Sequence, residues 1–288
     1  MNKVVSKLIP HRVKVWLQLM LQKGINEDVR EEKRLCGLPR YVKTETWCSG
    51  RKIAIVDAPS FLASKSEIFG SEIYRFRSDR QSPYIIDCGS NIGLSIIYFK
   101  MLYPDAKIVG FEADSEVFDV LLHNIETFKL NNVELFNKAV WHEETVLGFF
   151  SEGADAGRIG DGYDPTRTRS VQTTRLGGFM NQPVDFLKID IEGAEYEVLN
   201  DCKDLLKNVR NIFVEYHSSI KTEQKLQRIL DILAQAGFRY YLDRIGVCSP
   251  SPLYKGINVF LGMDNQVNIY GYRNAHYNEI PITRLESA

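Results

Sequence analysis

The fold class of this chain is indicated most clearly by Val184-Asp-Phe-Leu-Lys-Ile-Asp-Ile-Glu-Gly-Ala-Glu195. In this stretch a short apolar run delivers Asp190 to its end, and a glycine and a helical pattern follow. A second stretch, Tyr84-Ile-Ile-Asp-Cys-Gly-Ser-Asn-Ile-Gly93, repeats the arrangement around Asp87. Open α/β sheets bind their ligands at the carboxyl ends of parallel strands. Both stretches therefore predict an acidic side chain at the ligand-binding end of such a sheet.

From Tyr84 onward, β-prone runs alternate with helical patterns. Strands are expected over residues 84–87, 107–111, 133–140, 184–190 and 211–216, and helices over 93–103, 115–130, 194–207 and 222–236. Two more strands, over 238–242 and 257–261, follow with no helix between them. Unbroken apolar runs such as Ile212-Phe-Val suit strands covered on both faces. The pattern predicts an α/β, Rossmann-like fold with a mostly parallel, seven-stranded sheet that ends in an antiparallel hairpin.

Three segments are expected along the chain. Residues 1–80 form an N-terminal extension of helices and short strands, with β-prone runs at 52–56 and 73–76. Residues 81–265 form the sheet domain, and residues 266–288 form a C-terminal tail. Residues 151–183 are the main irregular stretch, and a loop of this length in a compact domain usually serves function or moves.

Composition narrows the function classes. The chain has 288 residues and a formal net charge of −1, so a nucleic-acid partner receives no electrostatic support. Its five cysteines form no C-x-x-C pair, which argues against a zinc site or a disulfide framework and favours the reducing cytoplasm. Residues 1–26 are basic, free of acidic residues and amphipathic. They predict a helix that lies on a membrane surface or packs on this domain or a partner subunit.

The turn after the first strand of the sheet is a candidate ligand site. Gly89 and Gly93 allow a sharp turn and a close ligand approach to the backbone, and Asp87 can accept hydrogen bonds from a ligand's ammonium group. The dinucleotide fingerprint Gly-x-Gly-x-x-Gly is absent. We expect the cofactor to contact Asp87, Gly89, Ser90, Asn91 and Gly93. A tight strand-to-helix turn also needs glycine whatever it binds.

The ends of the next two strands complete a nucleoside site. Glu112 follows the second strand and can accept both hydroxyls of a ribose, while Asp114 is expected to cap the next helix. Ala113 adjoins this site. Ala139 and Val140 end the third strand and leave room for an adenine ring, although a buried strand end explains them equally well. The spacing points to S-adenosylmethionine as cofactor and to methyl transfer as reaction.

An acidic cluster marks the opposite side of the expected cleft. Asp190 ends the fourth strand, and Glu215 and His217 end the fifth, two residues apart and so on one face. Two roles are open for these three residues. His217 can act as a general base toward an acceptor hydroxyl. Alternatively, Asp190 with Glu215 or His217 can hold Mg²⁺. Glu195 is expected to stabilise the first turn of the following helix.

Together, these segments resemble the FkbM family of S-adenosylmethionine-dependent methyltransferases, and the Lys-Ile-Asp-Ile-Glu-Gly-Ala-Glu run is the most specific match. The resemblance spans roughly residues 70–262. Family proteins commonly carry proline at the position of Ala113 and a residue without a thiol at that of Cys88, and neither difference removes a functional group. The resemblance implies O-methylation of a hydroxyl on a sugar, a glycan or a natural-product-type small molecule. The alternatives are a nucleotide-binding oxidoreductase and a non-catalytic Rossmann-like scaffold.

The expected partners follow from this interpretation. We expect a small-molecule or glycan acceptor and no nucleic acid, with peripheral membrane contact through the basic helix and homo-oligomerisation left open. Arg158, Arg167 and Arg169 lie in the loop over residues 151–175 and would suit an anionic or glycan acceptor if the loop closes over it.

Overall fold

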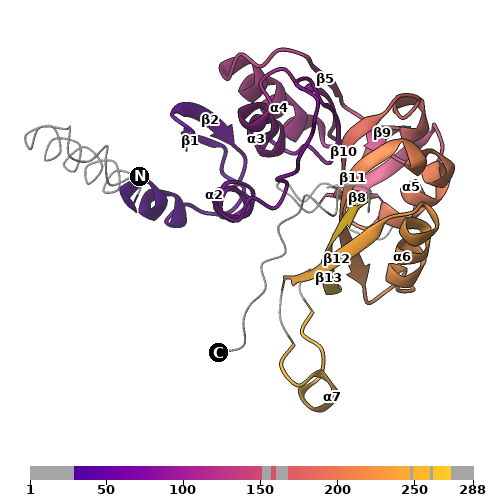
Figure 1. The fold of residues 1–288 in the computed structure, drawn as a ribbon. Coiled ribbons are helices and arrows are strands. Elements are labelled where there is room, and N and C mark those ends of the chain that lie inside the picture. The colour runs from indigo at the N-terminus through magenta and orange to yellow at the C-terminus, as the bar shows by residue number, and fades with distance from the viewer. Residues whose placement is uncertain (1–28, 151–156, 160–167, 247–248, 260–261, 274–288) are drawn as a thin grey trace, which may run out of the picture.

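A seven-stranded sheet forms the centre of the protein (Figure 1). The computed structural model describes residues 29–150, 157–159, 168–246, 249–259 and 262–273. The sheet has the order β12-β13-β11-β10-β3-β4-β5, and β13 runs antiparallel to both of its neighbours while the other pairs are parallel. Its strands are β3 (Tyr84–Cys88), β4 (Lys107–Phe111), β5 (Val133–Phe136), β10 (Val184–Ile189), β11 (Val209–Ser219), β12 (Arg239–Ile245) and β13 (Met263–Tyr272). The predicted α/β fold, with a mostly parallel sheet and a terminal antiparallel pair, is confirmed.

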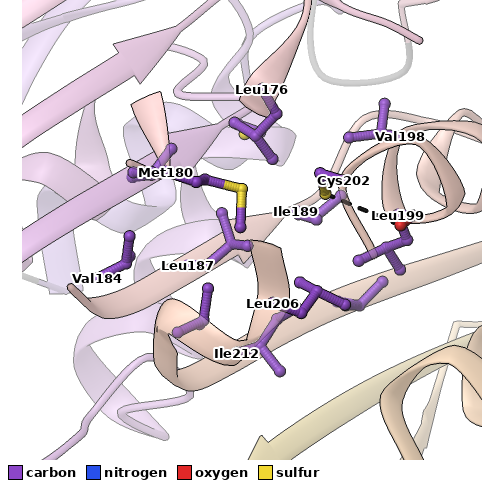
Figure 2. Close-up of a cluster of buried hydrophobic side chains, with 14 of the residues drawn as sticks. Leu176, Met180, Val184, Leu187, Ile189, Val198, Leu199, Cys202, Leu206 and Ile212 are labelled. Carbon is purple, nitrogen blue, oxygen red and sulfur yellow. Dashed lines mark hydrogen bonds between the residues drawn. The ribbon is translucent and has the colours of Figure 1, made fainter. Parts of the chain in front are cut away.

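Helices cover both faces of this sheet, and successive residues of one strand pack against the helices on opposite faces. The helices are α3 (Leu94–Leu102), α4 (Ser115–Thr127), α5 (Glu195–Cys202), the 3-10 helix η5 (Lys203–Asn208) and α6 (Leu226–Gln235). Ile85 packs in a core with α3 and α4, whereas Ile86 packs in a core with α5 and α6. Side chains alternate across a strand, so unbroken apolar runs fill two cores at once. Figure 2 shows the second core, in which Leu187 and Ile189 of β10 lie among side chains that include Val198 and Leu199 of α5.

Helix α4 begins at the predicted cap. The side chain of Asp114 accepts hydrogen bonds from the backbone amides of Glu116 and Val117, which otherwise have no partner within the helix. The predicted N-cap is therefore confirmed.

A second, four-stranded sheet corrects two predictions. It has the order β6-β9-β7-β8, with β6 (Ala139–Val140), β7 (Val146–Phe150), β8 (Arg158–Ile159) and β9 (Thr168–Thr174). The single strand expected over 133–140 is wrong, because β5 ends at Phe136 and Ala139 pairs with Thr173 of β9 instead. The stretch over 151–183 also contains β9 and the 3-10 helix η4 (Leu176–Phe179), while residues 151–156 and 160–167 lie outside the described part. Hydroxyl-bearing side chains give β9 little apolar signal.

The N-terminal segment packs on the α3 and α4 side of the large sheet. It comprises a helical stretch over 29–36, the hairpin of β1 (Thr44–Cys48) and β2 (Arg51–Ile55), α2 (Ala58–Lys65) and the π-helix η2 (Ser66–Gly70). Ile53 and Phe61 share a core with Phe99 of α3. The β-prone run at 52–56 is confirmed as β2, but no strand forms at 73–76, because Tyr74 and Phe76 pack against Phe99 instead. The expected basic helix over residues 1–26 lies outside the described residues.

The end of the sheet differs from expectation. The strand expected over 257–261 does not form over residues 257–259, where Ile257 is exposed and a short helix, α7 (Pro252–Lys255), precedes; residues 260–261 lie outside the described part. Strand β13 instead runs through Tyr272, past the expected domain boundary at residue 265. The sequence did not predict this strand, because its apolar pattern is interrupted by the polar side chains of Asn265, Gln266 and Asn268. No helix in the described part of the chain is long and apolar enough to cross a membrane.

Candidate active site

A cavity of about 310 Å³ opens at the carboxyl ends of β3, β4, β10 and β11, between the large sheet and α2. Nine residues predicted for the site contribute to its wall: Gly89, Ser90, Asn91, Glu112, Ala113, Ala139, Val140, Asp190 and Glu215. Three other predicted residues, Asp87, Gly93 and His217, do not line it. The sequence therefore located the cavity and much of its wall. It did not foresee that α2 supplies Ser60, Phe61 and Ser64 to the opposite side.

Gly89 and Gly93, both predicted to contact the cofactor, are needed for different structural reasons. Gly89 has a φ of +85°, and a β-carbon there would lie 1.9 Å from the carbonyl oxygen of Asp190. Its lack of a side chain lets the turns after β3 and β10 meet at the cavity. Gly93 has a φ of +92°, and a β-carbon there would lie 2.7 Å from Leu121 Cδ1 of α4. Gly93 is therefore required for helix packing and lies away from the cavity.

Asp87 lies within the sheet and is fully buried. Ser95 Oγ donates a hydrogen bond to its Oδ2 at 2.6 Å, and Lys188 Nζ lies 3.4 Å from its Oδ1. Burial raises the pKa of Asp87, while Lys188 and Ser95 oppose this shift. Since Asp87 does not reach the cavity, its role in the structure is to hold Lys188 and Ser95.

Lys188 belongs to the site, although the sequence pattern predicted no role for it. It is 2% exposed, yet it belongs to the cavity wall. Its Nζ donates to the carbonyl of Gly89 at 2.8 Å and lies 3.2 Å from Asp190 Oδ2. Burial disfavours the charged form, but Asp190, Tyr74 and Asp87 outweigh burial and raise the pKa of Lys188 well above its usual value. The signal was present in the sequence, since a lysine stands in a strand predicted to be buried.

Glu112 is held in place by the backbone. The amide of Asn91 donates to Oε2 at 2.9 Å, and the amide of Asp114 donates to Oε1 at 2.8 Å. Burial raises the pKa of Glu112 to about 7 against the lowering effect of these two amides. Each carboxylate oxygen can accept more than one hydrogen bond, so both oxygens retain capacity for a ligand's hydroxyl groups.

His217 lies behind the acidic wall of the cavity, among three glutamates. Its Nδ1 is 3.0 Å from Glu195 Oε1, and its Nε2 is 3.3 Å from Glu215 Oε1 and 3.6 Å from Glu192 Oε1. Burial disfavours the imidazolium, but Glu192, Glu195 and Glu215 raise the pKa of His217 well above its usual value. His217 does not line the cavity, so its imidazole cannot contact an acceptor hydroxyl there directly. The structure thus argues against the predicted role of His217 as general base.

The carboxyl groups around His217 are also perturbed. Burial first, and then the repulsion of Asp190, raise the pKa of both Glu192 and Glu215. Glu195 accepts a hydrogen bond from the backbone amide of Gly193 at 2.8 Å in addition to its contact with His217. Glu195 was predicted only to stabilise the first turn of α5 by its charge. In the structure it also orients the imidazole of His217.

The three residues that could share a metal ion in the structure differ in one residue from the predicted metal ligands Asp190, Glu215 and His217. Among the described residues, Asp190, Glu192 and His217 place one ligand atom each within 4.8 Å of one another. Glu215, which was predicted as a ligand, does not belong to this group. Glu192 replaces it, because the loop after β10 turns back toward β11.

Arg169, one of the three arginines expected to reach the acceptor, does not line the cavity. Arg169 lies in β9 and forms an ion pair with Glu116, and both side chains are about half exposed. Arg158 belongs to the two-residue strand β8, and its side chain lies outside the described part, as does Arg167 as a whole. Closure of this loop over an acceptor remains a prediction.

Comparison with known proteins finds methyltransferases among the proteins similar to this chain. Residues 87–240 match the family model described as the methyltransferase FkbM domain. Methyltransferase sdnD of Sordaria araneosa is 27% identical over 220 residues, which is 62% of this chain and 82% of that protein. The 2-O-methyltransferase NoeI of Sinorhizobium fredii is 26% identical over 178 residues, or 54% of this chain and 72% of that protein.

A solved structure is also similar. The crystal structure of methyltransferase FkbM from Methylobacillus flagellatus superposes with a TM-score of 0.45 at 14% identity. The match covers 70% of this chain but 46% of that one, so this chain spans less than half the length of that protein.

Proposed function

The chain belongs to the FkbM family of methyltransferases, and from this premise we propose that it transfers the methyl group of S-adenosylmethionine to a hydroxyl oxygen of a sugar, a glycan or a natural-product-type small molecule. The observation that carries the proposal is the position of Glu112. This carboxylate is fixed by two backbone amides at the end of β4, on the wall of the cavity. In α/β proteins an acid at this position accepts the hydroxyls of a ribose.

The cofactor would lie along the ends of β3, β4 and β6. Glu112 would bind the ribose, and Ala139 and Val140 would contact the adenine ring. The turn at Gly89–Asn91 would receive the methionine end, near the ammonium group of Lys188, which suits a carboxylate. The sulfonium would then face the acidic wall at Asp190.

The rest of the cavity suits a hydroxylated acceptor. The residues of its wall include Ser60, Ser64, Asp190, Glu215 and Phe61. Hydroxyl and carboxyl groups can bind several hydroxyls of one ligand, and a ring can pack on its apolar face. The name of the relative NoeI states 2-O-methylation, which supports oxygen as the atom that is methylated.

Transfer would proceed by in-line displacement. The acceptor oxygen forms a bond to the methyl carbon, and the carbon–sulfur bond breaks with its electron pair going to sulfur. Since the sulfonium is already positive, the enzyme needs to align the two reactants and remove the hydroxyl proton. We assign proton removal to Glu215 and orientation of the hydroxyl to Asp190, because both carboxyl groups line the cavity.

Calorimetry with S-adenosylhomocysteine and with NAD tests this proposal against an oxidoreductase. We expect S-adenosylhomocysteine to bind and NAD not to bind. Glu112→Ala should weaken S-adenosylhomocysteine binding by about 1–3 kcal/mol, the usual cost of hydrogen bonds that involve a charged group. Glu126→Ala, at an exposed position on α4, is the matched control and should leave affinity unchanged. NAD binding without S-adenosylhomocysteine binding would refute the proposal.

A further inference from the structure

Three side chains behind and beside the acceptor end of the cavity form a group suited to a metal ion. Asp190 and Glu192 follow β10, and His217 lies on β11 next to it. Their ligand atoms all lie within 4.8 Å of one another. Nitrogen and oxygen ligands lie about 2.0–2.2 Å from an ion such as Zn²⁺, so these atoms need only a small rearrangement to share one ion.

Two buried atoms of this group have no hydrogen-bond partner. His217 is 7% exposed, and its Nε2 makes no hydrogen bond, although Glu215 Oε1 lies 3.3 Å away. Glu192 Oε2 is likewise buried and without a hydrogen bond. Buried polar atoms in folded proteins are nearly always paired, and a bound ion is one of the explanations for an exception. Both atoms belong to the group that meets within 4.8 Å, so their missing partner would lie inside it.

The other ring nitrogen of His217 is held as in known metal sites. Nδ1 lies 3.0 Å from Glu195 Oε1, and the amide of Gly193 donates to the same oxygen at 2.8 Å. A metal-binding histidine characteristically donates its second N–H to a carboxylate, which fixes the ring and directs the other nitrogen at the ion. The ion would take the place of the proton on that nitrogen, because a ligating imidazole is neutral. Glu195 is 1% exposed, so this support is built into the core.

The charges of the neighbourhood also favour a cation. Four carboxyl groups, those of Asp190, Glu192, Glu195 and Glu215, surround the site, against the two basic side chains of His217 and Lys188. Lys188 contacts Oδ2 of Asp190 at 3.2 Å, which leaves Oδ1 of that carboxylate for an ion.

We propose that Asp190, Glu192 and His217 bind a divalent transition-metal ion such as Mn²⁺, with Glu195 as the residue that positions the histidine. An imidazole ligand favours this class over Mg²⁺, which prefers oxygen ligands alone. Asp190 and Glu192 line the cavity, so the ion would present its open positions to the acceptor. This consequence rests on the proposed methyl transfer: the ion would bind the acceptor hydroxyl and lower its pKa.

The test uses the full chain, freed of metal by a chelator, without cofactor or acceptor. Mn²⁺ is titrated and followed by electron paramagnetic resonance. We expect one Mn²⁺ per chain and a hyperfine coupling to an imidazole nitrogen. Glu192→Gln should weaken binding by at least tenfold, and His217→Ala should also remove the nitrogen coupling. Glu192→Gln changes one atom, so it keeps the test valid if His217→Ala does not fold.

A matched control separates this proposal from the proposed cofactor site. Glu112→Gln alters another buried carboxyl group of the same cavity, and it should retain Mn²⁺ binding while losing affinity for S-adenosylhomocysteine. Glu192→Gln should show the opposite behaviour. Absence of Mn²⁺ binding, absence of the nitrogen coupling, or equal Mn²⁺ affinity in the wild type and Glu192→Gln would overturn the metal site and leave the cofactor site standing.

Discussion

The carbonyl oxygen of Asp190 occupies the space that a β-carbon on Gly89 would need, at 1.9 Å from the position of that carbon. The turns after β3 and β10 are thereby in contact, and the part of the cavity wall that contains Gly89 and Asp190 depends on this contact.

Gly89→Ala should therefore disrupt both stability and binding. The backbone at φ +85° disfavours alanine, and the overlap with Asp190 forces the turns apart. We expect a loss of about 2–4 kcal/mol in the free energy of unfolding. Urea unfolding measures this loss, and calorimetry should show weaker S-adenosylhomocysteine binding. Gly178→Ala, where no atom lies within 4 Å of the added carbon, should change stability by less than about 0.5 kcal/mol. Equal effects of the two substitutions would contradict this explanation.

Lys188→Met should be strongly destabilising, because it leaves Asp87 and Asp190 without their buried cation. Breaking a buried ion pair from one side costs about 3–5 kcal/mol. Addition of Asp87→Asn to Lys188→Met should restore part of this loss, since it removes the stranded charge. Lys107→Met, at an exposed position on β4, is the control for the loss of a lysine. A double variant less stable than Lys188→Met alone would show that the ion pair is not the cause.

Much of the large sheet could be predicted because its parallel strands are covered on both faces and so carry unbroken apolar runs. Strands β9 and β13 were missed for the opposite reason. Their side chains are largely polar, and their positions depend on partners far away in the sequence, such as Val146–Phe150 and Val209–Ser219. The strand expected from residue 257 shows the converse error, since the apolar Ile257 and Val259 pair with no strand and stay exposed.

For the site, too, features set by the local sequence could be predicted, whereas features set by contacts between distant segments could not. Strand ends and glycine turns placed nine of the predicted residues on the cavity wall. The role of Glu192 depends on its left-handed backbone, with φ +57°, which the sequence did not signal, because glycine, asparagine and aspartate are the residues that favour this conformation. The contacts of His217 with three glutamates likewise depend on how the loop after β10 meets β11.

The affinity for S-adenosylhomocysteine should depend on pH through Glu112. The pKa of Glu112 is about 7 in the unliganded protein, and the carboxylate is the form that accepts the ribose hydroxyls. Affinity should be highest above pH 7 and should fall as the pH is lowered through 7 toward 6, because a proton then competes with the ligand. Calorimetry between pH 5.5 and 8 checks this slope. Glu112→Gln should bind more weakly and show no such slope, and a flat profile in the wild type would contradict the assignment.

Asp57→Ala should loosen the acceptor side of the cavity. Burial disfavours the charge of Asp57, but hydrogen bonds from Tyr41, Ser60 and Arg40 lower its pKa, and it caps α2. Loss of such a cap costs about 1–2 kcal/mol. The contribution is present above the unfolded pKa and is lost as pH falls through the lower folded pKa. Urea unfolding at pH 7 should show the cost, whereas binding of S-adenosylhomocysteine should change little. Unchanged stability at pH 7 would refute the capping role.

Glu215→Gln should slow methyl transfer by about 10²- to 10⁴-fold, the usual range for removal of a general base. S-adenosylhomocysteine affinity should remain within a few-fold of that of the wild type, because Glu215 lies on the acceptor side. Mass spectrometry with trideuteromethyl-labelled cofactor and a panel of hydroxylated acceptors measures the rate. A wild-type rate in Glu215→Gln would assign proton removal to another group.

The central claim is that the cavity at the ends of β3 and β4 holds an adenosyl cofactor by its ribose. A crystal structure of the full chain soaked with S-adenosylhomocysteine tests it most directly. We predict that the two ribose hydroxyls lie within hydrogen-bond distance of the Glu112 carboxylate, with the sulfur directed at Asp190. An adenosyl group bound elsewhere, or a cavity filled by the protein's own side chains, would contradict the claim.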